Sequence, residues 1–69
     1  MTPNLLRQLW SLVENTQAPV ILGRDDASLV EWLLDQLARQ RSLEGYETEV
    51  ISDYIRSKTS LIRDLAAQR

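Results

Sequence analysis

Apolar residues recur at helical spacing from residue 46 to residue 66, further than in any other part of the chain. Their arc on a helical wheel covers about 200°, twice the ~100° that a surface helix needs to face one core. We therefore predict one long helix over residues 45–67. The nine apolar positions that define it are Tyr46, Val50, Ile51, Tyr54, Ile55, Leu61, Ile62, Leu65 and Ala66.

The weak point of this predicted helix is Lys58–Ser60, because Thr59 or Ser60 can cap a separate helix that begins near Leu61. Ile55, Lys58, Ile62 and Leu65 nevertheless keep one helical phase across this point. We favour the continuous helix, and a break near Lys58–Ser60 is the alternative.

Two shorter helices are predicted before it, over residues 3–14 and 26–40. Thr2 is the expected N-cap of the first, with Pro3 at the first helical position, where its missing N–H costs nothing. Asp25-Asp26 lies at the start of the second helix, and either aspartate can cap the free N–H groups there.

Pro19 separates these two helices, because proline cannot continue a helix. No second strand is in view to pair with Val20-Ile21-Leu22, so we interpret these residues as an apolar linker against the core. The predicted fold is all-α: a single domain over residues 1–69, with three helices of which the C-terminal one is long. Four helices is the alternative, if the chain breaks near Lys58–Ser60.

Composition leaves such a core with few means of stabilisation. A chain of 69 residues buries only about 60% of its unfolded surface, and without cysteine it forms no disulfide. Self-association is the remaining means, so we expect a homodimer or a complex with another protein. The net charge is −2. We see no signal peptide and no apolar stretch of the ~20 residues that cross a bilayer, so we expect a cytoplasmic protein without a membrane partner.

The candidate partner-binding residues lie on the second and third helices. Trp32 falls about 60° outside the apolar arc of its helix, which suits a binding hot spot, although packing against the first helix or the linker is the more common role of such a tryptophan. Lys58 lies inside the apolar stripe, where a lysine usually lays its stem on apolar surface and extends its charge into water. The full set is Trp32, Tyr54, Ile55, Lys58, Leu61, Ile62 and Leu65.

An enzyme is not expected, and neither is a cofactor, a metal ion or a small-molecule substrate. The chain has no histidine, which is the commonest general base and metal ligand. Asp25 and Asp26 are adjacent and point in different directions at a helix start, so capping is their expected role.

The second helix, the connector over residues 42–45 and the third helix have the outline of a helix-turn-helix. A nucleic-acid-binding regulator would use Arg39, Arg41, Arg56 and Lys58, but Glu47, Glu49 and Asp53 on the front of the recognition helix would repel phosphates. We therefore expect a small protein–protein interaction module, an adaptor or regulatory subunit that acts through the apolar stripe of its C-terminal helix. The nucleic-acid reading is the alternative.

Two segments, Gly-Arg-Asp-Asp-Ala-Ser-Leu at residues 23–29 and Ile-Ser-Asp-Tyr-Ile-Arg-Ser at residues 51–57, resemble small uncharacterised helical proteins of cyanobacteria. Neither segment is a motif with known chemistry. The resemblance therefore implies a helical fold and no functional residue.

Overall fold

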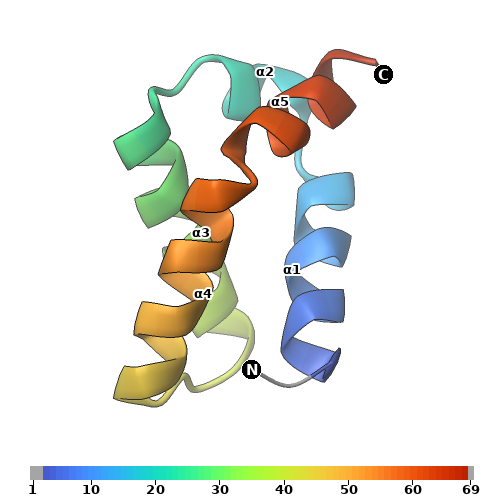
Figure 1. Ribbon diagram of the computed structural model, residues 1–69. Helices are drawn as coiled ribbons and strands as arrows, with labels where there is room; N and C mark the ends of the chain where they lie inside the picture. Colours follow the sequence, from blue (N-terminus) through green and yellow to red (C-terminus); the bar gives the residue numbers. More distant parts are fainter. Residues whose placement is uncertain (1–2, 69) are drawn as a thin grey trace.

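The computed structural model describes residues 3–68, and these residues form five helices and no strand (Figure 1). The fold is all-α, as the sequence predicts. Thr2, the expected cap of the first helix, lies outside the described residues. The helices are α1 (Pro3–Asn15), α2 (Ala18–Leu22), α3 (Asp26–Gln40), α4 (Gly45–Ser57) and α5 (Thr59–Ala67).

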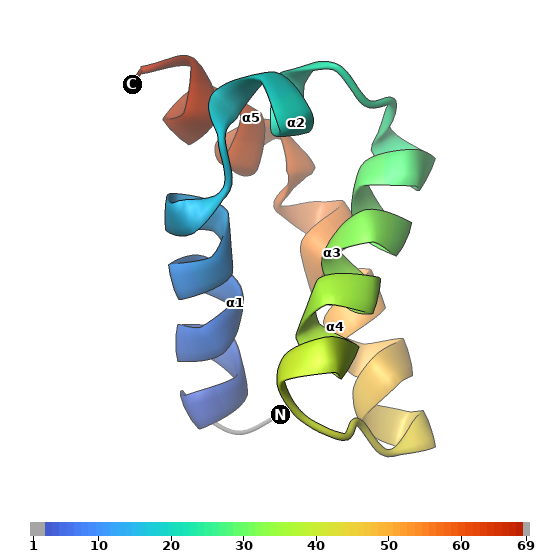
Figure 2. The ribbon, with the colours of Figure 1, turned by 180° about the vertical axis from the view of Figure 1, so that it is seen from behind.

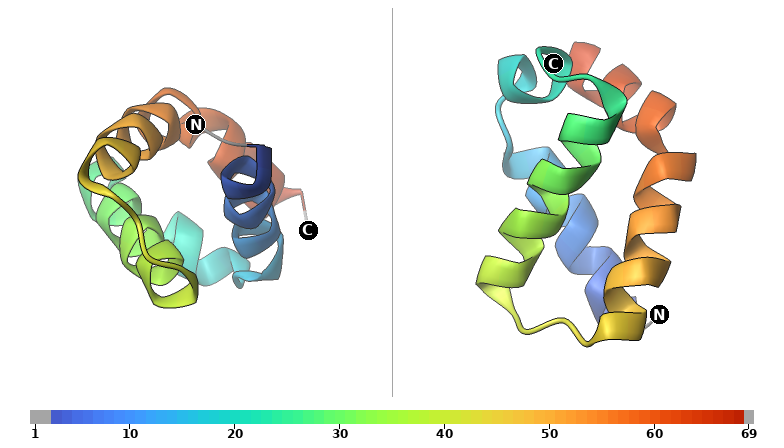
Figure 3. Two further views of the ribbon diagram at one scale, coloured as in Figure 1. Left: turned by 90° about the horizontal axis from the view of Figure 1, so that it is seen from below. Right: turned by 90° about the vertical axis from the view of Figure 1, so that its left-hand side faces the viewer.

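The three longest helices run along the length of the molecule, and the two short ones close one end. α3 packs against both α1 and α4, while α2 packs against α5 (Figures 1 and 2). Seen along the long axis, α1, α3 and α4 surround a common interior, and α3 contacts both of the other two helices (Figure 3).

Every helix contributes to the core. Its thirteen hydrophobic members are Leu5, Leu9, Leu12, Val13, Ile21, Leu29, Val30, Leu33, Leu37, Ile51, Ile55, Ile62 and Ala66. On α3 they recur at spacings of three and four, so they share one face of the helix. The start of α3 is capped as predicted, since the Asp25 carboxylate accepts a hydrogen bond of 2.8 Å from the Ser28 amide.

The prediction that Val20–Leu22 is a linker is wrong, because the segment Ala18–Leu22 is the helix α2. Pro19 lies within the first two positions of this helix, where a missing N–H removes no helical hydrogen bond. A short helix is rarely stable alone. Here Ile21 is fully buried against the rest of the core, which stabilises the turn.

The prediction of one continuous C-terminal helix is also wrong. Lys58, with φ −109° and ψ 8°, ends α4 and precedes α5, at the point where the alternative placed a break. The buried Thr59 hydroxyl donates to the carbonyls of Ile55 and Arg56, at 3.0 and 3.1 Å, and so satisfies the last turn of α4. The alternative count of four helices is wrong as well, since α2 is a fifth.

Arg63 of α5 joins the two short helices to the start of α3. Its guanidinium donates to the carbonyls of Ile21 and Arg24, at 3.2 and 2.8 Å, and to the Asp26 carboxylate at 2.7 and 3.2 Å. These bonds satisfy carbonyls at the end of α2 and in the following turn. They also fix the position of α5 relative to α3.

Candidate functional site

The rings of Trp10 on α1 and Tyr54 on α4 contact each other between these two helices. The ring centroids are 6.3 Å apart at an interplanar angle of 85°, an edge-to-face arrangement. The Trp10 indole N–H donates a hydrogen bond of 3.1 Å to the Tyr54 hydroxyl. Both side chains are half-buried, so each leaves part of its ring at the surface.

Lys58 extends this pair toward α5. Its Nζ lies 5.9 Å from the centre of the Tyr54 ring, within the range of a cation–π interaction. Leu61 and Leu65 follow at spacings of three and four residues, which places them on one side of α5. They are 45% and 38% exposed, high values for leucine. We call Trp10, Tyr54, Lys58, Leu61 and Leu65 the apolar face.

Two predicted contact residues do not belong to this face. Ile55 and Ile62 are fully buried in the core, so the prediction that they belong to a binding surface is wrong. The reason is that a stripe of about 200° is wider than the face that a helix presents to the core. Ile55 and Ile62, seven residues apart, share the inner part of this stripe, and Leu61 and Leu65 lie on its outer part.

Trp32 is half-buried and packs against the core. The Arg24 guanidinium lies 5.4 Å from the centre of its ring, and an Arg24 N–H donates to the Ser28 hydroxyl at 3.3 Å. The turn after α2 therefore covers part of the indole. Its role in association stays a prediction, and we leave Trp32 out of the apolar face.

Trp10 is not among the predicted partner-binding residues, and the structure adds it to them. Leu9, its neighbour, is fully buried, whereas Trp10 is at the edge of the helix's apolar side. A shallow depression on α1 includes Trp10 among its lining residues Pro3, Leu6, Arg7, Trp10, Ser11 and Glu14. The size of the ring, too large to be enclosed by one helix interface, is the signal that points to this edge position.

A second exposed apolar pair lies on the outer side of α4. Tyr46 and Val50, four residues apart, are 62% and 41% exposed. Glu49 and Asp53 are exposed on the same helix. Tyr46 and Val50 lie in the first half of α4, away from its junction with α5, so they make a useful control for Leu61 and Leu65.

The basic residues of the nucleic-acid alternative are mostly engaged elsewhere. Arg39 forms an exposed ion pair with Asp35 at 3.1 Å, and Arg41 bonds Gln8 at 3.3 Å. Glu47, expected on the front of a recognition helix, is instead buried, and it accepts a hydrogen bond of 3.2 Å from the Glu44 amide. Arg39 and Arg41 lie at the end of α3, and Arg56 and Lys58 lie at the end of α4, which runs in the opposite direction, so these four residues form no continuous basic stripe (Figure 1).

Comparisons with protein-family models, curated proteins and solved structures find no match for this chain. The resemblance to small cyanobacterial proteins therefore stays a prediction. Among residues 3–68, no helix has the length and apolar character to cross a membrane. The same residues contain no group of three or more acidic, histidine or cysteine side chains placed to hold a metal ion.

Proposed function

We propose that this protein is a small interaction module that binds another protein through the apolar face. The observations that carry the proposal are the exposure of Leu61 and Leu65, four residues apart on α5, and the half-buried pair of Trp10 and Tyr54. Exposed aromatic and aliphatic side chains that lie together are typical of binding surfaces, and tryptophan and tyrosine are enriched among hot spots.

The accessible surface area of the single chain supports a contact between subunits that fold separately. The chain exposes 4393 Å², close to the roughly 4,450 Å² expected of a monomeric protein of its mass. The proposed contact is therefore one that a folded subunit makes and breaks, as in an adaptor or regulatory subunit. A second copy of the chain is the first partner to test.

Sedimentation velocity of the purified protein at about 1 to 100 µM is the first experiment, since a dimer with micromolar Kd is populated over this range. The variant with Leu61→Ser and Leu65→Ser removes the apolar side of α5, and Tyr46→Ser with Val50→Ser is the matched control. We expect a concentration-dependent dimer that only the α5 variant abolishes. A monomer at every concentration would exclude the second copy as partner.

Site-specific photo-crosslinking in the native cell tests the proposal beyond self-association. A crosslinking amino acid at position 61 should give one discrete adduct, which the same amino acid at position 46 does not give. The Leu65→Ser change should reduce the yield of this adduct. Equal labelling from both positions, or no adduct from position 61, would contradict an interaction role for the apolar face.

A further inference from the structure

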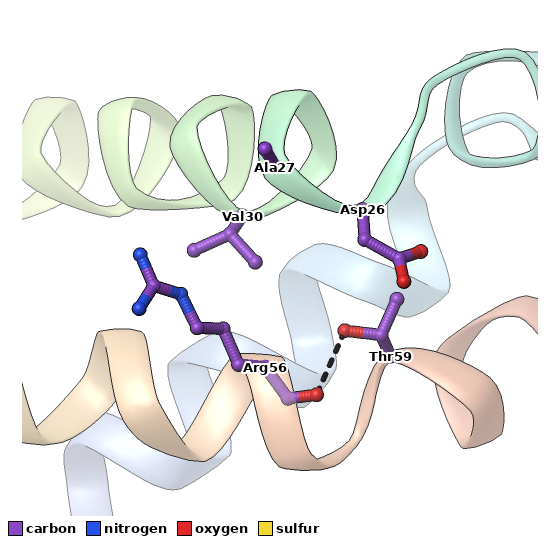
Figure 4. Close-up of a pocket in the computed structure, with 5 residues that line it drawn as sticks. All are labelled: Asp26, Ala27, Val30, Arg56 and Thr59. Atoms are coloured by element: carbon purple, nitrogen blue, oxygen red, sulfur yellow. Dashed lines mark hydrogen bonds between the residues drawn. The ribbon is translucent and has the colours of Figure 1, made fainter.

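A pocket of about 340 Å³ lies on a different part of the molecule, between the start of α3 and the junction of α4 and α5 (Figure 4). It shares no residue with the apolar face. This volume is at the small end of ligand-binding pockets. The residues that line it are Asp26, Ala27, Val30, Arg56 and Thr59.

The pocket has opposite charges at its two ends and apolar side chains between them. Figure 4 shows the Arg56 guanidinium and the Asp26 carboxylate on opposite sides of Val30, with Ala27 above the same space. The Arg56 side chain makes no ion pair or hydrogen bond with another residue of the range 3–68. Asp26 pairs with Arg63 through Oδ1, while its Oδ2 takes no hydrogen bond from a described residue.

The distance between these charges selects among charged ligands. Asp26 and Val30 are four residues apart on α3, a rise of about 6 Å, and Arg56 lies beyond Val30 as seen from Asp26 (Figure 4). The ammonium and carboxylate of an α-amino acid are attached to the same carbon, so such a ligand reaches one end of the pocket only. A molecule with an aliphatic chain between its two charges reaches both.

We propose that this pocket binds a linear aliphatic zwitterion whose carboxylate and ammonium groups are separated by about five carbon atoms. Arg56 holds the carboxylate in the planar geometry that guanidinium groups favour. Asp26 Oδ2 accepts from the ammonium, and the chain lies on Ala27 and Val30. A free ω-amino acid has this chemistry, and so does the C-terminal lysine of a protein.

Titration of the isotope-labelled protein, followed by the amide signals of Ala27, Val30 and Thr59, tests the ligand class. We use ε-aminocaproate as the probe. The controls are norleucine, which carries its ammonium on the α carbon, caproate, which lacks the ammonium, and hexylamine, which lacks the carboxylate. Both ion pairs are exposed, so binding is expected in the millimolar range. Removal of either charge from the ligand should weaken binding about threefold to fivefold.

Nα-acetyl-lysine and its amide distinguish the two sources of this chemistry. The acid carries the charge pair of a C-terminal lysine, and the amide lacks the carboxylate. If the acid binds more tightly than ε-aminocaproate, the pocket recognises the end of a protein chain. If ε-aminocaproate binds more tightly, a free ω-amino acid is the ligand. Both results support the proposed chemistry, whereas equal binding of the acid and the amide contradicts it.

Arg56→Gln and Asp26→Asn test the residues, with Arg39→Gln and Asp53→Asn as controls that remove the same charges from other exposed sites. We expect the first two to weaken ε-aminocaproate binding threefold or more and the controls to leave it unchanged. Circular dichroism establishes that each variant is folded, and Arg56→Gln, which removes no internal ion pair, is the decisive one. Equal binding to Arg56→Gln and to the native chain, or equal affinity for norleucine and ε-aminocaproate, would overturn the proposal.

Discussion

Arg63→Ala is expected to be the most destabilising single substitution outside the hydrophobic core. The Arg63 side chain is 26% exposed, and its guanidinium donates to two backbone carbonyls as well as to Asp26. Hydrogen bonds from a charged group contribute about 1.5–3 kcal/mol each when buried, and an exposed ion pair adds at most about 1 kcal/mol. Since Arg63 is partly solvated, we expect a total loss of about 2–4 kcal/mol.

That loss is large relative to the free energy of unfolding of the whole chain. At roughly 0.05–0.15 kcal/mol per residue, a chain of 69 residues has an unfolding free energy of about 3–10 kcal/mol. Urea denaturation followed by circular dichroism measures the difference directly. Arg63→Lys should recover only part of the loss, because an ammonium group lacks the planar fork that reaches several acceptors.

Arg39→Ala is the matched control, since Arg39 forms an exposed ion pair with Asp35 on a single helix. Its expected cost is about 0.5 kcal/mol or less. If Arg63→Ala and Arg39→Ala shift the denaturation midpoint equally, the bonds to the two carbonyls contribute nothing measurable. Arg63 would then not be the residue that fixes the position of α5.

Four further substitutions test local features of the fold, each by its effect on the free energy of unfolding. Thr59→Val keeps the shape but removes the hydroxyl that bonds two carbonyls, so it should cost about 1–2 kcal/mol; no loss would mean that water satisfies these carbonyls. Tyr54→Phe leaves the half-buried Trp10 N–H without its acceptor and should cost about 1 kcal/mol, with a change in tryptophan fluorescence. Gly45→Ala meets no atom within 4 Å and should stabilise by about 0.4–1 kcal/mol. Gly23→Ala should destabilise, because its Cβ would lie 2.8 Å from a backbone carbonyl oxygen; the opposite order of the two glycine variants would contradict the structure.

The helical class and the positions of the longer helices follow from local signals in the sequence. Spacing of apolar residues predicts α3 with the bounds that the structure has, and Asp25 identifies its cap. These features depend on residues within one or two turns of each other. They are therefore visible in the sequence without knowledge of the fold.

The predictions for α2 and for the C-terminal helix are wrong because contacts between residues far apart in the chain decide the local structure there. α2 is helical because Ile21 is buried by the packing of the whole chain, and its five residues are too few to show a helical period. The break at Lys58 does not shift the helical phase of the apolar residues, since Ile55 and Ile62 on either side of it are seven residues apart and both buried. The wheel treats α4 and α5 as one straight axis, and so it cannot separate core from surface residues.

The candidate surfaces show the same limit. Leu61 and Leu65 were predicted as contact residues because they belong to the stripe, and their exposure agrees with that hypothesis without testing it. The hydrogen bond from Trp10 to Tyr54 joins residues 44 positions apart. The pocket between Asp26 and Arg56 likewise joins α3 to the end of α4. Neither pairing leaves a signal in a single sequence.

The pairing of α2 with α5 has a consequence for the order in which this protein folds. Arg63 bonds the carbonyl of Ile21, a residue 42 positions earlier in the chain. A contact between residues so far apart closes a long loop, and so it costs more chain entropy than the contacts within one helix. We therefore expect the end of the core that α2 and α5 form to close later than the helices themselves.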